Sequence, residues 1–122
     1  MPESVIGRPY TFQVLFLDAM YQPMAVQNAS IDIFQFNSSG VKQYWVQAAA
    51  MSPVVPAEAG RYTYTYTLPT TLTDGDNLVG EMRGQDPDSG LVVRLEETVT
   101  AIASTRGGGG STGLIARFVK GG

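Results

Sequence analysis

The chain has 122 residues, a formal net charge of −3 at pH 7, and neither cysteine nor histidine. Its length suits one domain with one core, and 43% hydrophobic residues with 16% charged residues are typical of a globular chain. Disulfides and thiolate sites are excluded, and the usual general base and the commonest metal ligand are missing. We therefore expect a protein that is not an enzyme and that needs no cofactor and no metal.

The N-terminal stretch has no signal-peptide pattern, and the chain has no run of about 18 apolar residues. We expect a soluble, unprocessed protein without membrane partners. Residues 8–18 then predict a strand, because apolar side chains alternate along it. One face would carry Tyr10, Phe12, Val14 and Phe16, and the other Thr11, Gln13, Leu15 and Leu17.

Residues 31–47 predict a hairpin whose tip is Asn37 to Gly40. The alternation that starts at Ile31 breaks after Ile33, which indicates a bulge or a change of exposure. Residues 48–59 contain Pro53 and Pro56, which cannot donate to a central ladder, so this segment is predicted to be an edge strand or a crossing loop.

Residues 60–69 carry the clearest period-two pattern of the chain. Threonine suits the solvent face of such a strand, so the row Tyr62, Tyr64 and Tyr66 is expected to face inward. Residues 78–102 predict a second hairpin around the turn Pro87-Asp88-Ser89-Gly90.

No window shows helical spacing, and turns recur about every ten residues. The prediction is an all-β fold: a single immunoglobulin-like antiparallel β-sandwich of about seven strands, with an extended C-terminal arm. Residues 1–103 would form the sandwich, 104–113 a glycine-rich hinge, and 114–122 an apolar and basic docking tip.

The stretches "FQVLFLDAMYQPMAVQNASIDIFQF", "AGRYTYTYTLP" and "DGDNLVGEMRGQDPDSGLVVRLEETV" resemble the immunoglobulin-like or macroglobulin-like domains of bacterial surface proteins and of tailed-bacteriophage virions. The resemblance covers roughly residues 8–102 and rests on marks of the fold, such as a Gly-x-Tyr strand that ends in proline. It implies a repeated structural protein of the virion, made in the bacterial cytoplasm and placed in the neck (head-tail connection) or tail or decorating the capsid.

Two sequence patterns that resemble chemical sites are better explained as structural features. Gly108, Gly110 and Gly113 match Gly-x-Gly-x-x-Gly, but too few residues follow to build a dinucleotide-binding unit, so we interpret them as linker. Glu96 and Glu97 are adjacent, so they point to opposite faces of a strand and are interpreted as solvated carboxylates rather than as an acid–base pair.

Acidic turns leave a calcium site open. If strands simply alternate direction, Asp18, Asp74 and Asp76 lie at one end of the sandwich, with Asp86 and Asp88 at the other end. Asp-Gly and Pro-Asp-Ser-Gly are also ordinary turn sequences, and this interpretation is favoured.

The arm differs from the body in charge. Residues 1–103 hold all eleven acidic and five basic residues, a net charge of −6, whereas the arm from Ser104 onward carries a net charge of +3. This asymmetry argues against direct readout of nucleic acid by the body. It suggests that the tip adds a strand to an acidic, partly apolar groove, for which an identical neighbour is a candidate. The predicted protein-interface residues are Leu15, Leu17, Arg106, Leu114, Ile115, Arg117, Phe118, Val119 and Lys120.

The expected function is therefore structural: copies of the protein would bind one another and neighbouring virion proteins through the sandwich faces and the arm. The alternative is a carbohydrate-binding or surface-binding adhesion module that uses Trp45, with Tyr44, as an aromatic platform for sugars.

Overall fold

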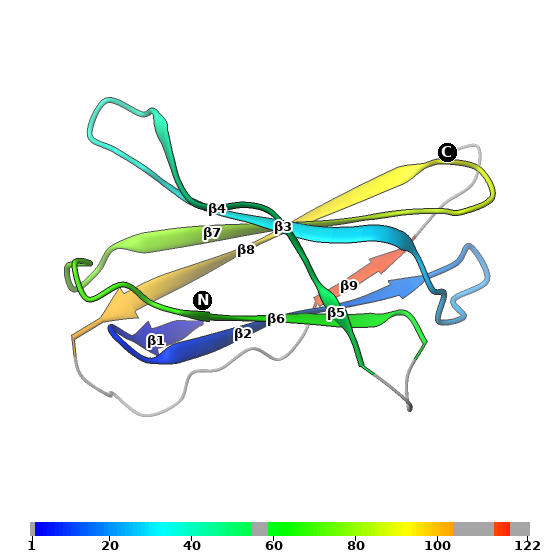
Figure 1. Cartoon of the computed structure of the whole chain (residues 1–122), viewed down its shortest axis with the longest axis horizontal. Coiled ribbons are helices and arrows are strands. Elements are labelled where there is room, and N and C mark those ends of the chain that lie inside the picture. Colours follow the sequence, from blue (N-terminus) through cyan, green and yellow to red (C-terminus); the bar gives the residue numbers. More distant parts are fainter. Residues whose placement is uncertain (1, 55–58, 104–113, 118–122) are drawn as a thin grey trace.

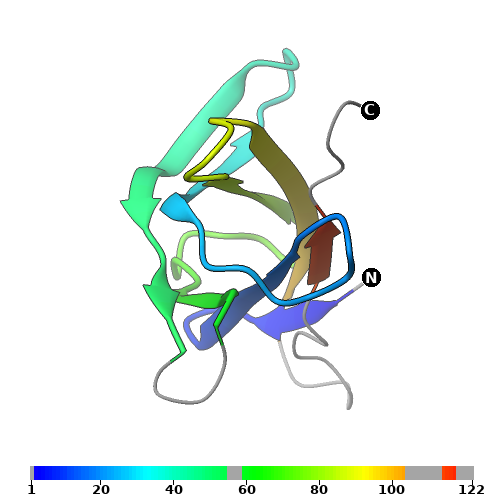
Figure 2. The same cartoon turned by 90° about the vertical axis from the view of Figure 1, so that its right-hand side faces the viewer.

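The computed structural model describes residues 2–54, 59–103 and 114–117, which form two β-sheets that face each other (Figures 1 and 2). The five-stranded sheet has the order β1-β8-β7-β3-β4 and the four-stranded sheet the order β5-β6-β2-β9. The strands are β1 (Glu3–Val5), β2 (Pro9–Leu17), β3 (Gln27–Phe36), β4 (Lys42–Ala50), β5 (Ser52–Pro53), β6 (Arg61–Thr67), β7 (Asn77–Gln85), β8 (Val92–Ile102) and β9 (Leu114–Arg117). The predicted all-β sandwich is confirmed, and none of the described residues belongs to a helix that could cross a membrane.

The core lies between the sheets and is built by alternation along each strand. In β2 the predicted inward row is confirmed, since Tyr10, Phe12, Val14 and Phe16 are all buried while the residues between them are half-buried. Facing strands supply the other half of the core, chiefly Ile31, Ile33, Leu78, Met82 and Val99. Burying side chains of this size stabilises the fold by about 1.5–3 kcal/mol each.

The strand β6 also follows its predicted faces. Tyr62 is buried and Tyr64 and Tyr66 are half-buried against the core. The Tyr62 hydroxyl accepts a hydrogen bond from Val26 N at 3.0 Å and donates one to Val26 O at 3.2 Å. The tyrosine row therefore packs inward, and at Tyr62 it also fastens the β2–β3 loop to the core.

The predicted hairpin of β3 and β4 is confirmed, with its tip at Asn37 to Gly40. Asn37 Oδ1 accepts hydrogen bonds from Ser39 N and Val41 N, and Gly40 has a φ of 78°, which suits glycine. The register shifts on both sides of Ile33, so the predicted bulge is confirmed as well.

The segment after β4 moves from one sheet to the other. Met51 separates β4 from β5, and β5 makes only two pairs, Ser52 with Thr63 and Pro53 with Tyr62. An edge position suits Pro53, as predicted, because proline has no N–H to give to a ladder. The predicted edge strand is thus β5, and β4 and β5 run on in one direction.

The strand count and the edges differ from the prediction. The described residues contain nine strands rather than about seven, and two edge pairs are parallel: β1 with β8 and β2 with β9. The three-residue β1 is too short to show a period, so its place depends on its partner β8. Two strands that pair in parallel cannot be joined by a tight hairpin turn. The chain between β1 and β8, and between β2 and β9, therefore has to cross over.

Candidate assembly surface

Strand β9 lies at the edge of the four-stranded sheet, next to β2. Strand β9 pairs with β2 in parallel, in the register Val14 with Leu114, Leu15 with Ile115, Phe16 with Ala116 and Leu17 with Arg117. Figure 1 shows β9 beside β2 at the margin of the sheet. The segment predicted to add a strand does form one, and it lies on the sheet of its own chain.

Two groups of predicted interface residues therefore meet. Leu15 and Leu17 are half-buried on the outer face of β2, and their backbones pair with Ile115 and Arg117. Ala116 is only 5% exposed and joins the hydrophobic core, so β9 is partly held by burial as well as by backbone hydrogen bonds. The predicted residues Arg106, Phe118, Val119 and Lys120 lie outside the described residues.

A charged network covers the outer face of the five-stranded sheet. Arg83 donates to Asp32 Oδ2 at 2.9 Å and Oδ1 at 3.2 Å, and Glu81 Oε1 lies 3.5 Å from Arg83 Nη1 and 3.3 Å from Arg94 Nη1. The Asp32 carboxylate also accepts a hydrogen bond from Ala48 N. The guanidinium of Arg83, more than the Ala48 amide, holds the pKa of Asp32 below its usual value, and Asp32 in turn raises the pKa of Arg83.

The same outer face carries aromatic rings at the β3–β4 hairpin. Phe34 is buried on this face by Phe36 and Tyr44, with ring centroids 5.6 and 5.7 Å away, and by the Lys42 ammonium, which lies 4.3 Å from its ring centroid. Phe36 and Tyr44 are themselves 54% and 44% exposed. This aromatic cluster is a second surface that can take part in contacts.

Trp45 does not join that cluster. Ile33 pairs with Val46 while Phe34 pairs with Tyr44, so Trp45 is the extra residue of a bulge. Its Nε1 donates to Gln35 Oε1 at 2.7 Å, whereas the Tyr44 ring packs on Phe34. Adjacent residues of β3 point to opposite faces, so the two rings do not form one flat platform.

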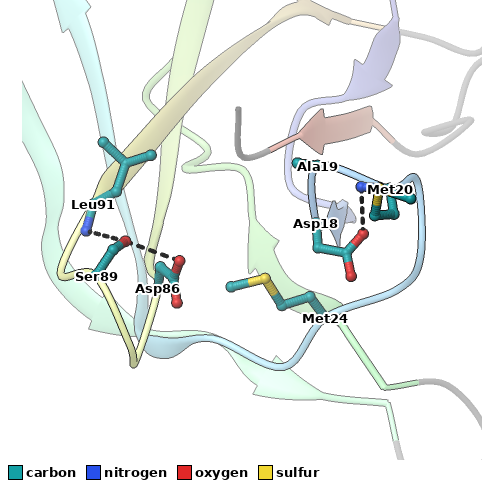
Figure 3. Close-up of a pocket in the computed structure, with 7 residues that line it drawn as sticks. All are labelled: Asp18, Ala19, Met20, Met24, Asp86, Ser89 and Leu91. Atoms are coloured by element: carbon teal, nitrogen blue, oxygen red, sulfur yellow. Dashed lines mark hydrogen bonds between the residues drawn. The ribbon is translucent and has the colours of Figure 1, made fainter. Parts of the chain in front are cut away.

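A pocket of about 210 Å³ opens at the end of the sandwich where β2 finishes (Figure 3). The β2–β3 loop contributes Asp18, Ala19, Met20 and Met24, and the β7–β8 turn contributes Asp86, Ser89 and Leu91. Asp18 Oδ1 accepts hydrogen bonds from Met20 N at 2.8 Å and Gln22 N at 3.0 Å. Asp86 holds its own turn through Asp88 N and Ser89 Oγ, both at 2.9 Å. The pocket thus combines an apolar floor with two carboxylates.

The prediction that Asp18, Asp74 and Asp76 share one end of the sandwich is wrong. Asp18 follows β2, whereas Asp74 follows β6, which runs antiparallel to β2. The prediction assumed that strands simply alternate direction, but β5 continues β4 into the other sheet without a reversal. Asp86 lies opposite Asp74, as expected, and so it meets Asp18 in the pocket.

The three aspartates shape turns. Asp74 Oδ1 accepts a hydrogen bond from Ala103 N, and Asp76 Oδ2 accepts one from Thr73 N, both at 2.8 Å. Within the described residues, no group of three or more carboxylate, histidine or cysteine side chains is placed to hold a metal ion. The turn interpretation therefore accounts for these residues.

The two neighbouring glutamates do point to opposite faces, but only Glu96 is exposed. Glu97 is 7% exposed and takes an inward position in β8 together with Val99 and Ala101. The interpretation of Glu97 as a solvated carboxylate is therefore wrong. Residues two apart in a strand share a face, so the position of Glu97 relative to Val99 would have predicted that Glu97 is buried.

Comparison of the chain with models of protein families, with curated proteins and with solved structures gives no match in any of the three. The class of protein is accordingly defined by its own fold, a two-sheet β-sandwich whose four-stranded sheet ends in the C-terminal strand β9.

Proposed function

We propose that this protein is a non-enzymatic structural component that binds copies of itself by exchanging β9, and that it serves in the virion of a tailed bacteriophage. The observation that carries the assembly proposal is the position of β9 as the last strand beside β2, reached through the glycine-rich residues 104–113. The virion setting rests on the resemblance of residues 8–102 to virion domains.

Exchange of an edge strand between identical chains needs no new interface. The β2 edge offers the same backbone donors and acceptors, and the same recess for Ala116, to the β9 of a neighbour. Residues 104–113, if extended, span on the order of 30 Å, which is enough to cross to an adjacent copy. The net charge of +3 from Ser104 onward favours approach to a body of net charge −6.

The outer face of the five-stranded sheet supplies a second contact region under this proposal. Its aromatic cluster of Phe34, Phe36, Tyr44 and Lys42 presents half-exposed rings, which are enriched in protein interfaces. Neighbouring virion proteins are the proposed partners of this face. The separation of Trp45 from Tyr44 makes the carbohydrate-binding alternative less favoured.

The chain has no cysteine, so pairs of single-cysteine chains can test the exchange without background. The Cα atoms of paired residues in a sheet lie roughly 5 Å apart, within reach of a disulfide. Leu15→Cys chains are mixed with Ile115→Cys chains under assembly conditions and then oxidised. A heterodimer linked between positions 15 and 115 is the expected product, because only β9 of one chain on β2 of another brings these positions together.

The control mixture contains Leu15→Cys and Val41→Cys chains, since Val41 is exposed at the far hairpin tip and reports random collisions. Yields equal to those of the control would contradict the exchange. Imaging of the native assembly with the full chain and with a chain ending at Ser104 tests the virion role: the shortened chain should fold but fail to join.

A further inference from the structure

The fold does not explain why the pocket at the end of β2 is lined by exposed apolar side chains. Its apolar lining includes Met20, which is 77% exposed, and Leu91, which is 41% exposed. Asp18 Oδ1 accepts the hydrogen bonds from Met20 N and Gln22 N, and the Asp18 carboxylate is part of the pocket lining (Figure 3). Solvent-exposed methionine and leucine beside a carboxylate suit an amphipathic occupant.

The register of β9 brings one candidate to the pocket. Arg117 pairs with Leu17, and Leu17 immediately precedes Asp18. Because β9 runs parallel to β2 and Arg117 pairs with Leu17, the described part of β9 ends at the end of the sandwich where the pocket opens. The next residues are Phe118, Val119 and Lys120.

We propose that the segment Phe118–Lys120 docks in this pocket of its own chain and latches β9 onto β2. Three extended residues cover about 10 Å, so the segment is long enough to pass from Leu17 over the β2–β3 loop. Phe118 and Val119 supply apolar surface for Met20, Met24 and Leu91.

The size and the charge of the pocket fit this occupant. An apolar cavity of about 150 Å³ holds a benzene ring, so about 210 Å³ accommodates the ring of Phe118 with part of a neighbouring side chain. The Lys120 ammonium has two carboxylates, Asp18 and Asp86, at the rim. A segment tethered one residue away has a high effective concentration, which favours it over a separate molecule.

The latch does not depend on exchange between copies, because it concerns a single chain. When the segment leaves the pocket, β9 keeps its four backbone pairs with β2 and the burial of Ala116 but loses the contacts of the segment. Contacts in the pocket, outside β9, then determine how stably β9 stays paired with β2.

The test uses the full chain in dilute solution, studied by nuclear magnetic resonance. Nuclear Overhauser contacts are measured between the Phe118 ring and the methyl groups of Met20, Met24 and Leu91. A mixture of isotope-labelled and unlabelled chains separates contacts within one chain from contacts between chains. Amide hydrogen exchange at Leu114–Arg117 reports how firmly β9 is held.

We expect contacts within one chain. Phe118→Ala should raise amide exchange in β9 about tenfold, because it removes a buried ring. Lys120→Gln should raise it about threefold, and Asp18→Asn should raise it by no more than that, because Asp86 remains. The double variant should match Lys120→Gln, since that change alone removes both contacts of the ammonium. Asp18→Asn keeps the Oδ1 acceptor that the loop uses.

Two variants serve as matched controls. Arg8→Gln removes the same charge from an exposed position just before β2, and Val41→Ala removes exposed apolar surface from the far hairpin; neither should change exchange in β9. Absence of the Phe118 contacts together with unchanged exchange in Phe118→Ala would overturn the proposal. Contacts seen only between labelled and unlabelled chains would also overturn it, and would assign the pocket to a neighbouring copy.

The disulfide experiment of the previous section separates the two proposals. Loss of the Phe118 contacts with a retained 15–115 heterodimer would remove the latch and keep the exchange. Phe118 contacts within one chain, with a heterodimer yield no higher than the control, would keep the latch and remove the exchange.

Discussion

The ring of Phe12 fills the space above Gly80, where any other residue would carry a side chain. An ideal Cβ on Gly80 would lie 2.5 Å from Cε1 and 2.8 Å from Cδ1 of Phe12. The same arrangement recurs four residues along, where Phe16 lies over Gly84. At these two positions the sheets pack closely, because phenylalanine rings of β2 lie directly against glycines of β7.

Gly80→Ala should destabilise the protein by about 1–3 kcal/mol, because the added methyl group forces Phe12 out of its place in a packed core. Alanine is otherwise more stable than glycine inside a strand, but this gain in free energy is smaller than the expected cost of displacing Phe12. Urea unfolding measures the change. Ala50→Val adds atoms to an exposed strand position and should change the free energy of unfolding by less than about 0.5 kcal/mol; an equally small effect at Gly80 would show that Phe12 can move without cost.

Asp32→Asn should lower the free energy of unfolding by about 1–2 kcal/mol at pH 7, since it removes the charge that Arg83 binds. The folded-state pKa of Asp32 is lowered, so its contribution is present above the unfolded pKa of about 3.9 and is lost as the pH falls through the lower folded value. Unfolding measured from pH 2 to pH 8 should show the two proteins converging below about pH 4.

Asp88→Asn is the control for this pH dependence. It removes one negative charge from an exposed turn and should follow the parent protein across the whole range. A gap between the parent and Asp32→Asn that persisted at pH 2 would mean that the asparagine disturbs packing rather than an ion pair.

Ala116→Asp should release β9 from β2, because it places a carboxylate at a position that is 5% exposed and packed against the core. Hydrogen exchange should increase at Leu114–Arg117 while the β7 and β8 amides stay protected. The control Ala50→Asp puts the same group on an exposed strand. Protection of β9 that survived Ala116→Asp would show that the backbone pairs alone hold the strand.

The single tryptophan provides a direct test of the carbohydrate alternative. Trp45 is 40% exposed, so its fluorescence should respond to a sugar stacked on the ring. Under the assembly proposal, titration with bacterial-surface oligosaccharides leaves the emission unchanged. A saturable shift that Trp45→Ala abolishes, with Tyr21→Ala as a control for another exposed ring, would instead favour the adhesion module.

Alternation was the reliable signal in the sequence. It predicted both faces of β2 and the inward tyrosines of β6, because side chains in a strand must alternate whatever the partner. The turn residues predicted the two hairpins. It could not predict β1, whose three residues take their position from β8. It also could not show that the chain changes sheets at Met51 without reversing, and that single event misplaced Asp18 relative to Asp74.

The sequence predicted which segments contribute to the candidate surface, but it did not predict which of them pair with one another. The sequence identified Leu15, Leu17 and the Leu114–Arg117 segment, but a local pattern carries no information about which residues pair across a distance of about a hundred positions. The pocket of Asp18 and Asp86 arises from two turns that only the sheet topology brings together.

The position of β9 has a consequence for solubility. The other sheet margins resist further growth: β1 and β5 are three and two residues long, and β4 is interrupted by bulges. The β2 edge is long, regular and rich in aromatic and branched residues, so it is the margin on which uncontrolled strand addition would start. A chain that loses β9 is therefore exposed to aggregation, and the C-terminal strand acts as a protective cover for the protein that carries it.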